Sequence, residues 1–265
     1  MLHTENIIIP QLNTSLTVIG GIRDFHPLFG IISQASSDES MLIQAICQNN
    51  DLSIRTEKSR KRVALEVKRS LVHFNDDDHK ALVKEIMAVR IPLQDRQLFF
   101  VWQYSLNNDI FREITINVFV KSYLSGRAGI SKHDIIAFIK DLIQRNPSSK
   151  IKWAESTIET IATKYLNLMG KLGFLSTSRK KSFVPIRPSS EAQVIFLCFA
   201  HLFCAENKNI LKNKFLPLSF IPAEDLQARL KKLSVKGYFN MNFNGVSLNI
   251  ELSKSYQGIC NALYQ

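Results

Sequence analysis

The chain has 265 residues, of which 45% are hydrophobic, and only 10 glycines and 8 prolines, so its composition is that of an ordered globular protein and excludes a low-complexity polymer. Lysine and arginine number 34 against 23 acidic residues, which gives a formal net charge of +11. This excess favours an anionic partner such as nucleic acid or an acidic membrane surface. The length suits one large domain or two to three small ones.

Cysteine spacing and hydropathy indicate the expected cellular compartment. The four cysteines, Cys47, Cys198, Cys204 and Cys260, are scattered without CxxC spacing, which predicts reduced thiols in a cytoplasmic protein. The first residues lack the cationic and apolar regions of a signal peptide. The most apolar stretch, 192–205, is shorter than the roughly 20 residues of a membrane helix, so we expect a buried core helix and no membrane contact.

After an unassigned N-terminal segment that ends near residue 37, hydrophobic periodicity predicts successive helices. They span about 38–47, 57–74, 77–90, 94–106 and 108–124. The helix from Glu57 divides into an apolar face and a cationic face. The window 55–71 holds seven cations and two anions, a net +5. The candidate DNA contacts in this basic ridge are Arg55, Lys58, Lys61, Arg62, Lys68 and Arg69.

A second helical pattern begins at Ser131, the expected N-cap of a helix over 132–145. The next helix, 154–172, sets an apolar stripe against a polar face whose hydroxyls, amide and cations suit bases or phosphates. The candidate contacts there are Thr160, Thr163, Lys164, Asn167 and Lys171. An ordinary solvated face has the same composition, and Glu155 and Glu159 beside it would repel phosphates.

The segment after this helix predicts a β-hairpin with a cationic tip. Gly173 is expected to end the helix, and the tip carries Arg179, Lys180 and Lys181. Residues 171–187 contain five cations and no anion, so the two basic windows together hold +10 of the net +11. Localised charge of this kind is typical of proteins that bind a nucleic-acid backbone. Helix, helix, long helix and hairpin in this order indicate a winged helix-turn-helix.

The last third repeats that order. A core helix over 190–205 is followed by a helix over 223–235 and by the alternating residues 239–252, in which Asn244-Gly245 predicts a type I′ turn. The predicted fold class is therefore mainly α: a helical N-terminal bundle followed by winged helix-turn-helix-like units with small β-hairpins. We expect three domains, namely a helical N-terminal domain at 1–107, a winged-helix-like domain at 108–187 and a second helical or winged-helix-like domain at 188–265.

Catalytic signatures are missing from the sequence. It contains no phosphate loop, GxGxxG fingerprint, GxSxG elbow or HExxH motif. The run NDDDHK at 75–80 has carboxylates beside a histidine, which could hold Mg²⁺ or Mn²⁺ in a nuclease. Helix capping is the better interpretation, because aspartates favour helix N-termini. We predict no enzymatic activity, no cofactor and no metal site.

Three stretches carry a resemblance to a known family. They are IRTEKSRKRVALEVKRSL, IPLQDRQLFFVWQYSLNNDIFREI and KWAESTIETIATKYLNLMGKLGFL, within about residues 51–175. In these residue classes the chain resembles the BrxA proteins of BREX phage-defence systems. The resemblance implies a small, mostly helical, non-enzymatic DNA-binding component encoded beside a methyltransferase, an ATPase and a phosphatase-like protein, which are its expected protein partners. It supplies no catalytic residues.

Two functions agree with these observations. The first is binding of duplex DNA, mainly through backbone phosphates, by the basic ridge and the cationic hairpin. The alternative is a basic assembly adaptor that docks acidic protein partners of a defence complex. The residues do not distinguish duplex DNA from single strands or RNA.

Overall fold

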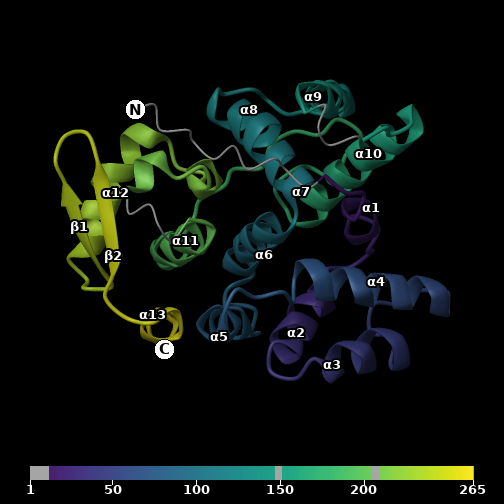
Figure 1. The fold of residues 1–265 in the computed structure, drawn as a ribbon, viewed down its shortest axis with the longest axis horizontal. Helices are drawn as coiled ribbons and strands as arrows, with labels where there is room; N and C mark the ends of the chain where they lie inside the picture. Colours follow the sequence, from purple (N-terminus) through teal and green to yellow (C-terminus); the bar gives the residue numbers. More distant parts are fainter. Residues whose placement is uncertain (1–11, 147–150, 205–208, 265) are drawn as a thin grey trace.

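The computed structural model describes residues 12–146, 151–204 and 209–264, and this part of the chain is mainly helical (Figure 1). The first third contains α1 (Leu16–Ile19), α2 (His26–Ala35), α3 (Ser40–Ile43), the π-helical turn η1 (Gln44–Gln48), α4 (Glu57–Ser70), α5 (Asp77–Ile86) and α6 (Leu93–Asn107). The middle contains α7 (Asp109–Ile114), the π-helical turn η2 (Thr115–Val120), α8 (Lys121–Leu124), α9 (Lys132–Arg145) and α10 (Glu155–Lys171). The last third contains α11 (Ser190–Phe203), the 3₁₀ turns η4 (Ile210–Lys212) and η5 (Leu216–Ser219), α12 (Ala223–Ser234), β1 (Phe239–Phe243), β2 (Leu248–Leu252) and α13 (Tyr256–Leu263).

The predicted helices from residue 38 to residue 235 are confirmed in number and order, with ends shifted by a few residues. The helix expected over 108–124 is a continuous helical run whose middle is the π-helical turn η2. Its start is capped by Asn108, whose side-chain oxygen accepts a hydrogen bond from the amide of Phe111 at 2.9 Å. The segment before residue 37, left unassigned, contains α1 and α2, and α13 also went unpredicted.

Helices α7 to α10 form the first winged-helix-like unit. The hairpin after α10 folds back on itself, because Leu175 forms an antiparallel bridge with Phe183. Its returning arm also bridges Gly129, which lies just before α9. The unit therefore has the predicted order of three helical elements and a hairpin, with a third short extended segment added to the hairpin.

The second unit runs from α11 to β2 and has the same plan. Strands β1 and β2 are antiparallel, with Phe239 opposite Leu252 and Phe243 opposite Leu248. That register leaves four residues at the tip, so the type I′ turn predicted for Asn244-Gly245 is wrong. Only Gly245 of the pair has a positive φ, 88°, whereas a type I′ turn requires both. The Asn244 side chain instead accepts hydrogen bonds from the next amides, which widens the loop.

Buried side chains from all parts of the chain join one hydrophobic cluster within the described residues. Helices α6 and α11 lie side by side in it (Figure 1), and the rings of Trp102 and Phe196 are 5.2 Å apart. Trp102 is fully buried and donates its indole hydrogen to the carbonyl oxygen of Leu218 at 2.8 Å. The expected core helix is confirmed, since α11 buries residues 194–200 without interruption. The three-domain division stays a prediction.

Candidate nucleic-acid interface

The basic ridge lies on α4, which begins where the Thr56 side chain accepts a hydrogen bond from the amide of Ser59 at 3.2 Å. Val63 and Val67 are buried on its inner face. The predicted contacts of this helix and its preceding loop are all exposed: Arg55, Lys58, Lys61, Arg62, Lys68 and Arg69. Two of them have acidic partners, because Lys61 pairs with Glu57 at 2.6 Å and Lys68 pairs with Glu39. Such exposed pairs are weak and leave both lysines available for exchange with phosphate.

The long helix of the first unit, α10, presents the predicted polar face to solvent. Its apolar stripe, which includes Ile161 and Tyr165, is fully buried, while Thr160, Thr163 and Asn167 are exposed. The hydroxyl of Thr160 donates to the carbonyl oxygen one turn earlier at 2.7 Å, and Thr163 does the same at 2.8 Å. Their hydroxyl protons are therefore engaged, so these side chains present oxygen lone pairs and methyl groups outward.

The two acids beside this face are neutralised by α9. Glu159 pairs with Lys132 at 2.8 Å, and Glu155 pairs with Lys140 at 2.7 Å. The hydrogen bond and the charge of Lys132 lower the pKa of Glu159. The repulsion of phosphate expected from these two glutamates is thus offset by cations supplied from the neighbouring helix.

The other two candidates on α10, Lys164 and Lys171, lie against α1. The Lys171 ammonium donates to the carbonyl oxygens of Ile22 and, at 3.4 Å, Gly20, and burial lowers its pKa. It therefore fastens α10 to the segment after α1. Contact at this place is close, because a methyl group on Gly20 would lie 2.6 Å from the Lys164 carbonyl oxygen. Glycine is required there for packing.

Helix α1 lies between α4 and α10 and contacts both helices (Figure 1). The Lys164 ammonium would lie 3.7 Å from a methyl group on Gly21, and Gly21 lines a cleft that Arg62 of α4 also lines. Cations from α4 and α10 therefore converge on the C-terminal end of α1. Arg62 and Lys164 are 102 positions apart in the sequence (164 − 62), so only the fold brings them together.

The cationic hairpin, hereafter the wing, is stiffened by its own polar groups. The hydroxyls of Ser176 and Ser178 donate to the carbonyl oxygen of Lys180 at 2.9 and 2.7 Å. The Lys181 ammonium turns inward to the carbonyl oxygens of Ser176 and Thr177 at 3.3 and 3.4 Å. Arg179 and Lys180 are exposed at the tip. Two of the three predicted wing cations therefore face solvent, and the third holds the wing in shape.

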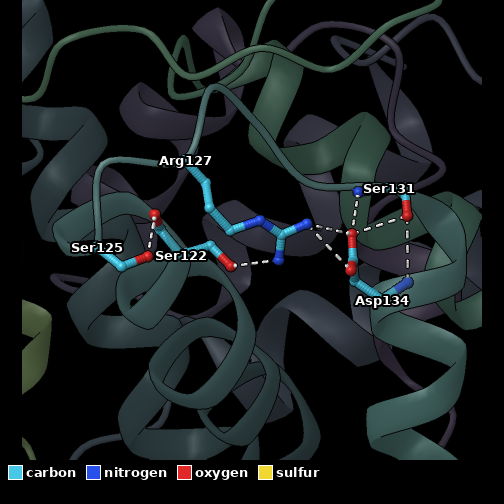
Figure 2. A network of polar contacts seen from close by, with 5 residues as sticks. All are labelled: Ser122, Ser125, Arg127, Ser131 and Asp134. Carbon is cyan, nitrogen blue, oxygen red and sulfur yellow. Dashed lines mark hydrogen bonds and ion pairs between the residues drawn. The ribbon is translucent and has the colours of Figure 1, made fainter.

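The turn between α8 and α9 contacts the returning arm of the wing, because Gly129 bridges Ser182. Figure 2 shows the capping box of α9, in which the Asp134 carboxylate accepts from the amide of Ser131 and the Ser131 hydroxyl oxygen accepts from the amide of Asp134. The same carboxylate also accepts from the hydroxyl of Ser131 and, at 3.2 Å, from Arg127. The other terminal nitrogen of Arg127 donates to the hydroxyl of Ser122 at 3.1 Å. This network holds in place the segment that contains Gly129, and Gly129 forms the bridge to the wing.

The run of acids at 75–80 caps helices. The carboxylate of Asp76 accepts from the amide of His79 at 2.7 Å at the start of α5, and Asp78 accepts from the amide of Tyr256 at 2.9 Å at the start of α13. The capping role is confirmed for Asp76, and Asp78 adds a second cap that sequence could not indicate. Within the described ranges, no group of three or more His, Cys, Asp or Glu side chains is placed to hold a metal ion.

One feature of this surface went unpredicted, a cleft of about 570 Å³ between α1 and the loop and helix of α4, hereafter the α1–α4 cleft. It is lined by Arg23, Arg55 and Arg62. The sequence indicated the last two as members of the ridge, whereas Arg23 is an isolated cation in the apolar N-terminal segment. Only the contact of α1 with α4 brings it to the others.

These features define a mainly helical protein with a winged-helix-like unit and a localised cationic surface. The chain belongs to the BrxA family, whose family model matches residues 23–196. It is therefore a member of a family of small BREX-system components that are not known as enzymes. No curated protein matches the sequence. Among the helices that the structure describes, none is both long and apolar enough to cross a membrane.

Proposed function

We propose that this BrxA-family chain is a non-catalytic DNA-binding component of a BREX phage-defence system that holds duplex DNA mainly through its backbone phosphates. The observation that carries the proposal is the convergence of Arg62 from α4 and Lys164 from α10 at the end of α1. The basic ridge and the polar face of α10 thereby become neighbours on one part of the molecule. Cations so grouped release counterions when they meet phosphates, and this release drives binding.

The wing adds a third contact to this arrangement. Arg179 and Lys180 project from a hairpin that its own serines and Lys181 hold rigid. A rigid wing loses little conformational entropy on binding, so its exposed cations contribute more of their attraction to the complex. Thr160, Thr163 and Asn167 would then face a groove, where their acceptor atoms and methyl groups meet base edges or sugars.

The proposal is tested by fluorescence anisotropy with a random-sequence duplex at several salt concentrations. The double variant Arg179→Ala/Lys180→Ala removes two exposed cations and leaves Lys181 to hold the wing. Loss of two phosphate contacts lowers the salt slope by about 1.8 and weakens binding to every sequence about tenfold or more. The matched control is Lys231→Ala/Lys232→Ala on α12, which removes the same charge from two exposed residues of the second unit.

An equal loss of affinity in both double variants contradicts the wing's role, because net charge alone would explain it. Absence of any shift of a random duplex by the unaltered chain, at low and moderate salt, contradicts DNA binding and favours the adaptor that docks acidic partners. A slope that changes only in the wing variant supports direct phosphate contact.

A further inference from the structure

The α1–α4 cleft combines three guanidinium groups with an apolar floor. Arg23, Arg55 and Arg62 line it, and its volume of about 570 Å³ is within the usual range of small-molecule sites. The floor is formed by the buried side chains of Ile22, Leu52 and Val63. Of the described residues that line the cleft, none is an aspartate or a glutamate. A cleft of this volume has room for one nucleotide-sized molecule.

Few acidic side chains offset the positive charge of the cleft arginines. In the described part of the chain, neither Arg23 nor Arg55 forms an ion pair with a carboxylate. Arg62 interacts with Glu66 one turn further along α4, and that carboxylate is half-buried, shared with Arg69 and outside the cleft. Three guanidiniums around one hollow repel each other, and an anion placed between them relieves the repulsion.

A hydroxyl at the start of α4 adds a donor. The Ser59 hydroxyl oxygen accepts the hydrogen of the Thr56 hydroxyl at 2.8 Å, so its own hydrogen is free to donate into the cleft that Ser59 lines. The positive end of the α4 dipole lies at the same place, because α4 begins at Glu57.

The loop that carries Arg55 is held in an unusual conformation. Asn50 and Ser53 have positive φ angles of 59° and 51°, which are rare for residues other than glycine. The Asn50 side-chain oxygen accepts from the amide of Ile54 at 2.7 Å, and its carbonyl oxygen accepts from the amide of Ser53 at 2.8 Å. These two hydrogen bonds hold the loop in this conformation, so this rim of the cleft is preorganised.

We propose that the α1–α4 cleft binds the phosphate of a single nucleotide, with Arg23, Arg55 and Arg62 around the phosphate oxygens and the base or sugar against the apolar floor. Arginine suits this role because its planar fork donates two parallel hydrogen bonds to phosphate. The nucleotide is either free or the unpaired end of a nucleic-acid strand. Only the second source rests on the proposed function, because it requires the chain to bind DNA.

The test uses isothermal titration calorimetry of the full chain with deoxyadenosine diphosphate at low salt. We expect binding of this nucleotide and none of deoxyadenosine, which lacks phosphate. The variant Arg23→Gln/Arg55→Gln should bind the nucleotide about tenfold or more weakly, since two charge-assisted contacts are lost. The control Lys231→Gln/Lys232→Gln removes equal charge from α12, outside the cleft, and should retain binding. Both pairs are exposed, so thermal unfolding should confirm an unchanged fold.

The outcomes separate this proposal from the one on DNA. Failure of deoxyadenosine diphosphate to bind, or equal binding by the cleft variant and the unaltered chain, overturns the cleft proposal even where duplex binding persists. Retention of nucleotide binding by Arg179→Ala/Lys180→Ala, with loss of duplex affinity, shows that the cleft and the wing act separately. Displacement of the bound nucleotide by a duplex with a 5′-phosphorylated overhang identifies a strand end as the ligand, and persistence of the bound nucleotide identifies a free nucleotide.

Discussion

In both winged-helix-like units, a lone β-bridge joins a residue just before the second helical element to the returning arm of the hairpin. Gly129 bridges Ser182 in the first unit, and Asn209 bridges Asn249 in the second. The hairpins themselves differ. The second is a ladder of five residue pairs, whereas the first has one isolated bridge and a tip with two exposed cations. The residues 239–252 of the second hairpin contain no lysine or arginine.

The cations of the second unit lie on α12, where the helix itself explains them. Glu224 and Asp225 occupy its first turn, and Lys231 and Lys232 occupy its last turn. This order complements the helix dipole, so these charges stabilise α12 without any partner. Arg179 and Lys180, at the tip of the wing, do not lie in the last turn of a helix and so do not complement a helix dipole. The shared topology therefore needs no cationic hairpin, so the fold alone does not account for the cations of the wing.

The largest effect is expected from a change at the β-bridge between Gly129 and Ser182 in the first unit. A methyl group on Gly129 would lie 2.0 Å from the carbonyl oxygen of Lys181, so the variant Gly129→Ala must displace the returning arm of the wing. We expect the free energy of unfolding to fall by about 2–3 kcal/mol, the usual cost of overpacking. Urea unfolding measures this change, and duplex affinity should fall with it because the wing moves.

Two controls bracket this variant. Gly30→Ala makes the same chemical change in α2, where a methyl group would have no atom within 4 Å, and should stabilise the chain by about 0.5–1 kcal/mol. Asn209→Ala removes the side-chain oxygen that accepts from the amide of Leu248 at 3.1 Å and should cost about 1 kcal/mol. A Gly129→Ala variant as stable as the unaltered chain would show that the first bridge does not position the wing.

Sequence was sufficient for the features that rest on local pattern. The amphipathic stripes of α4 and α10, the N-cap at Ser131 and the buried middle of α11 all follow from periodicity and capping chemistry, and each is confirmed. The wing was also predictable, since its turn-back follows Gly173, whose φ of 77° is the left-handed conformation that ends such helices.

Features that depend on tertiary contacts were not predictable. Helix α1 has only four residues and no side-chain cap, and it is defined by its packing between α4 and α10. The α1–α4 cleft therefore had no sequence signal, although Arg55 and Arg62 were recognised individually. At the second hairpin, Asn244-Gly245 favoured a two-residue turn, but Leu248 is fully buried opposite Phe243 and sets the register. Burial of an apolar residue outweighed the local turn preference.

A second, smaller difference is pH dependence in the turn that supports the first unit. Burial alone would raise the pKa of Asp134, but hydrogen bonds from the amide and hydroxyl of Ser131 and from Arg127 outweigh it and lower the pKa. The stabilisation is therefore present above the unfolded-state pKa near 4 and is lost as pH falls through the lower folded-state value. Asp134→Asn should cost about 1 kcal/mol at pH 7, with the difference from the unaltered chain shrinking as the pH falls below the unfolded-state pKa.

Urea unfolding at several pH values measures that difference, and Asp225→Asn in α12 provides the comparison. Asp225 pairs with Arg229 at 3.8 Å, and both side chains are exposed, so its loss should cost at most about 0.5 kcal/mol at pH 7. A cost for Asp134→Asn that stays constant from pH 7 to pH 3 would contradict the role of its ionised carboxylate in the capping box.

The smallest effect is expected from placing cations on the second hairpin. Val246 is 82% exposed at its tip, and Asn242 of β1 is also exposed, so Val246→Lys/Asn242→Lys should change the free energy of unfolding by less than about 0.5 kcal/mol. The variant gives the second hairpin the charge that the wing tip carries. Figure 1 places β1 and β2 at the opposite end of the molecule from α4 and α10. DNA held at the ridge and the wing would therefore not reach the added lysines, and the salt slope of duplex binding should stay unchanged. A slope that rises by about 1.8 would mean that the second unit also contacts phosphates, and the two units would then differ in charge but not in use.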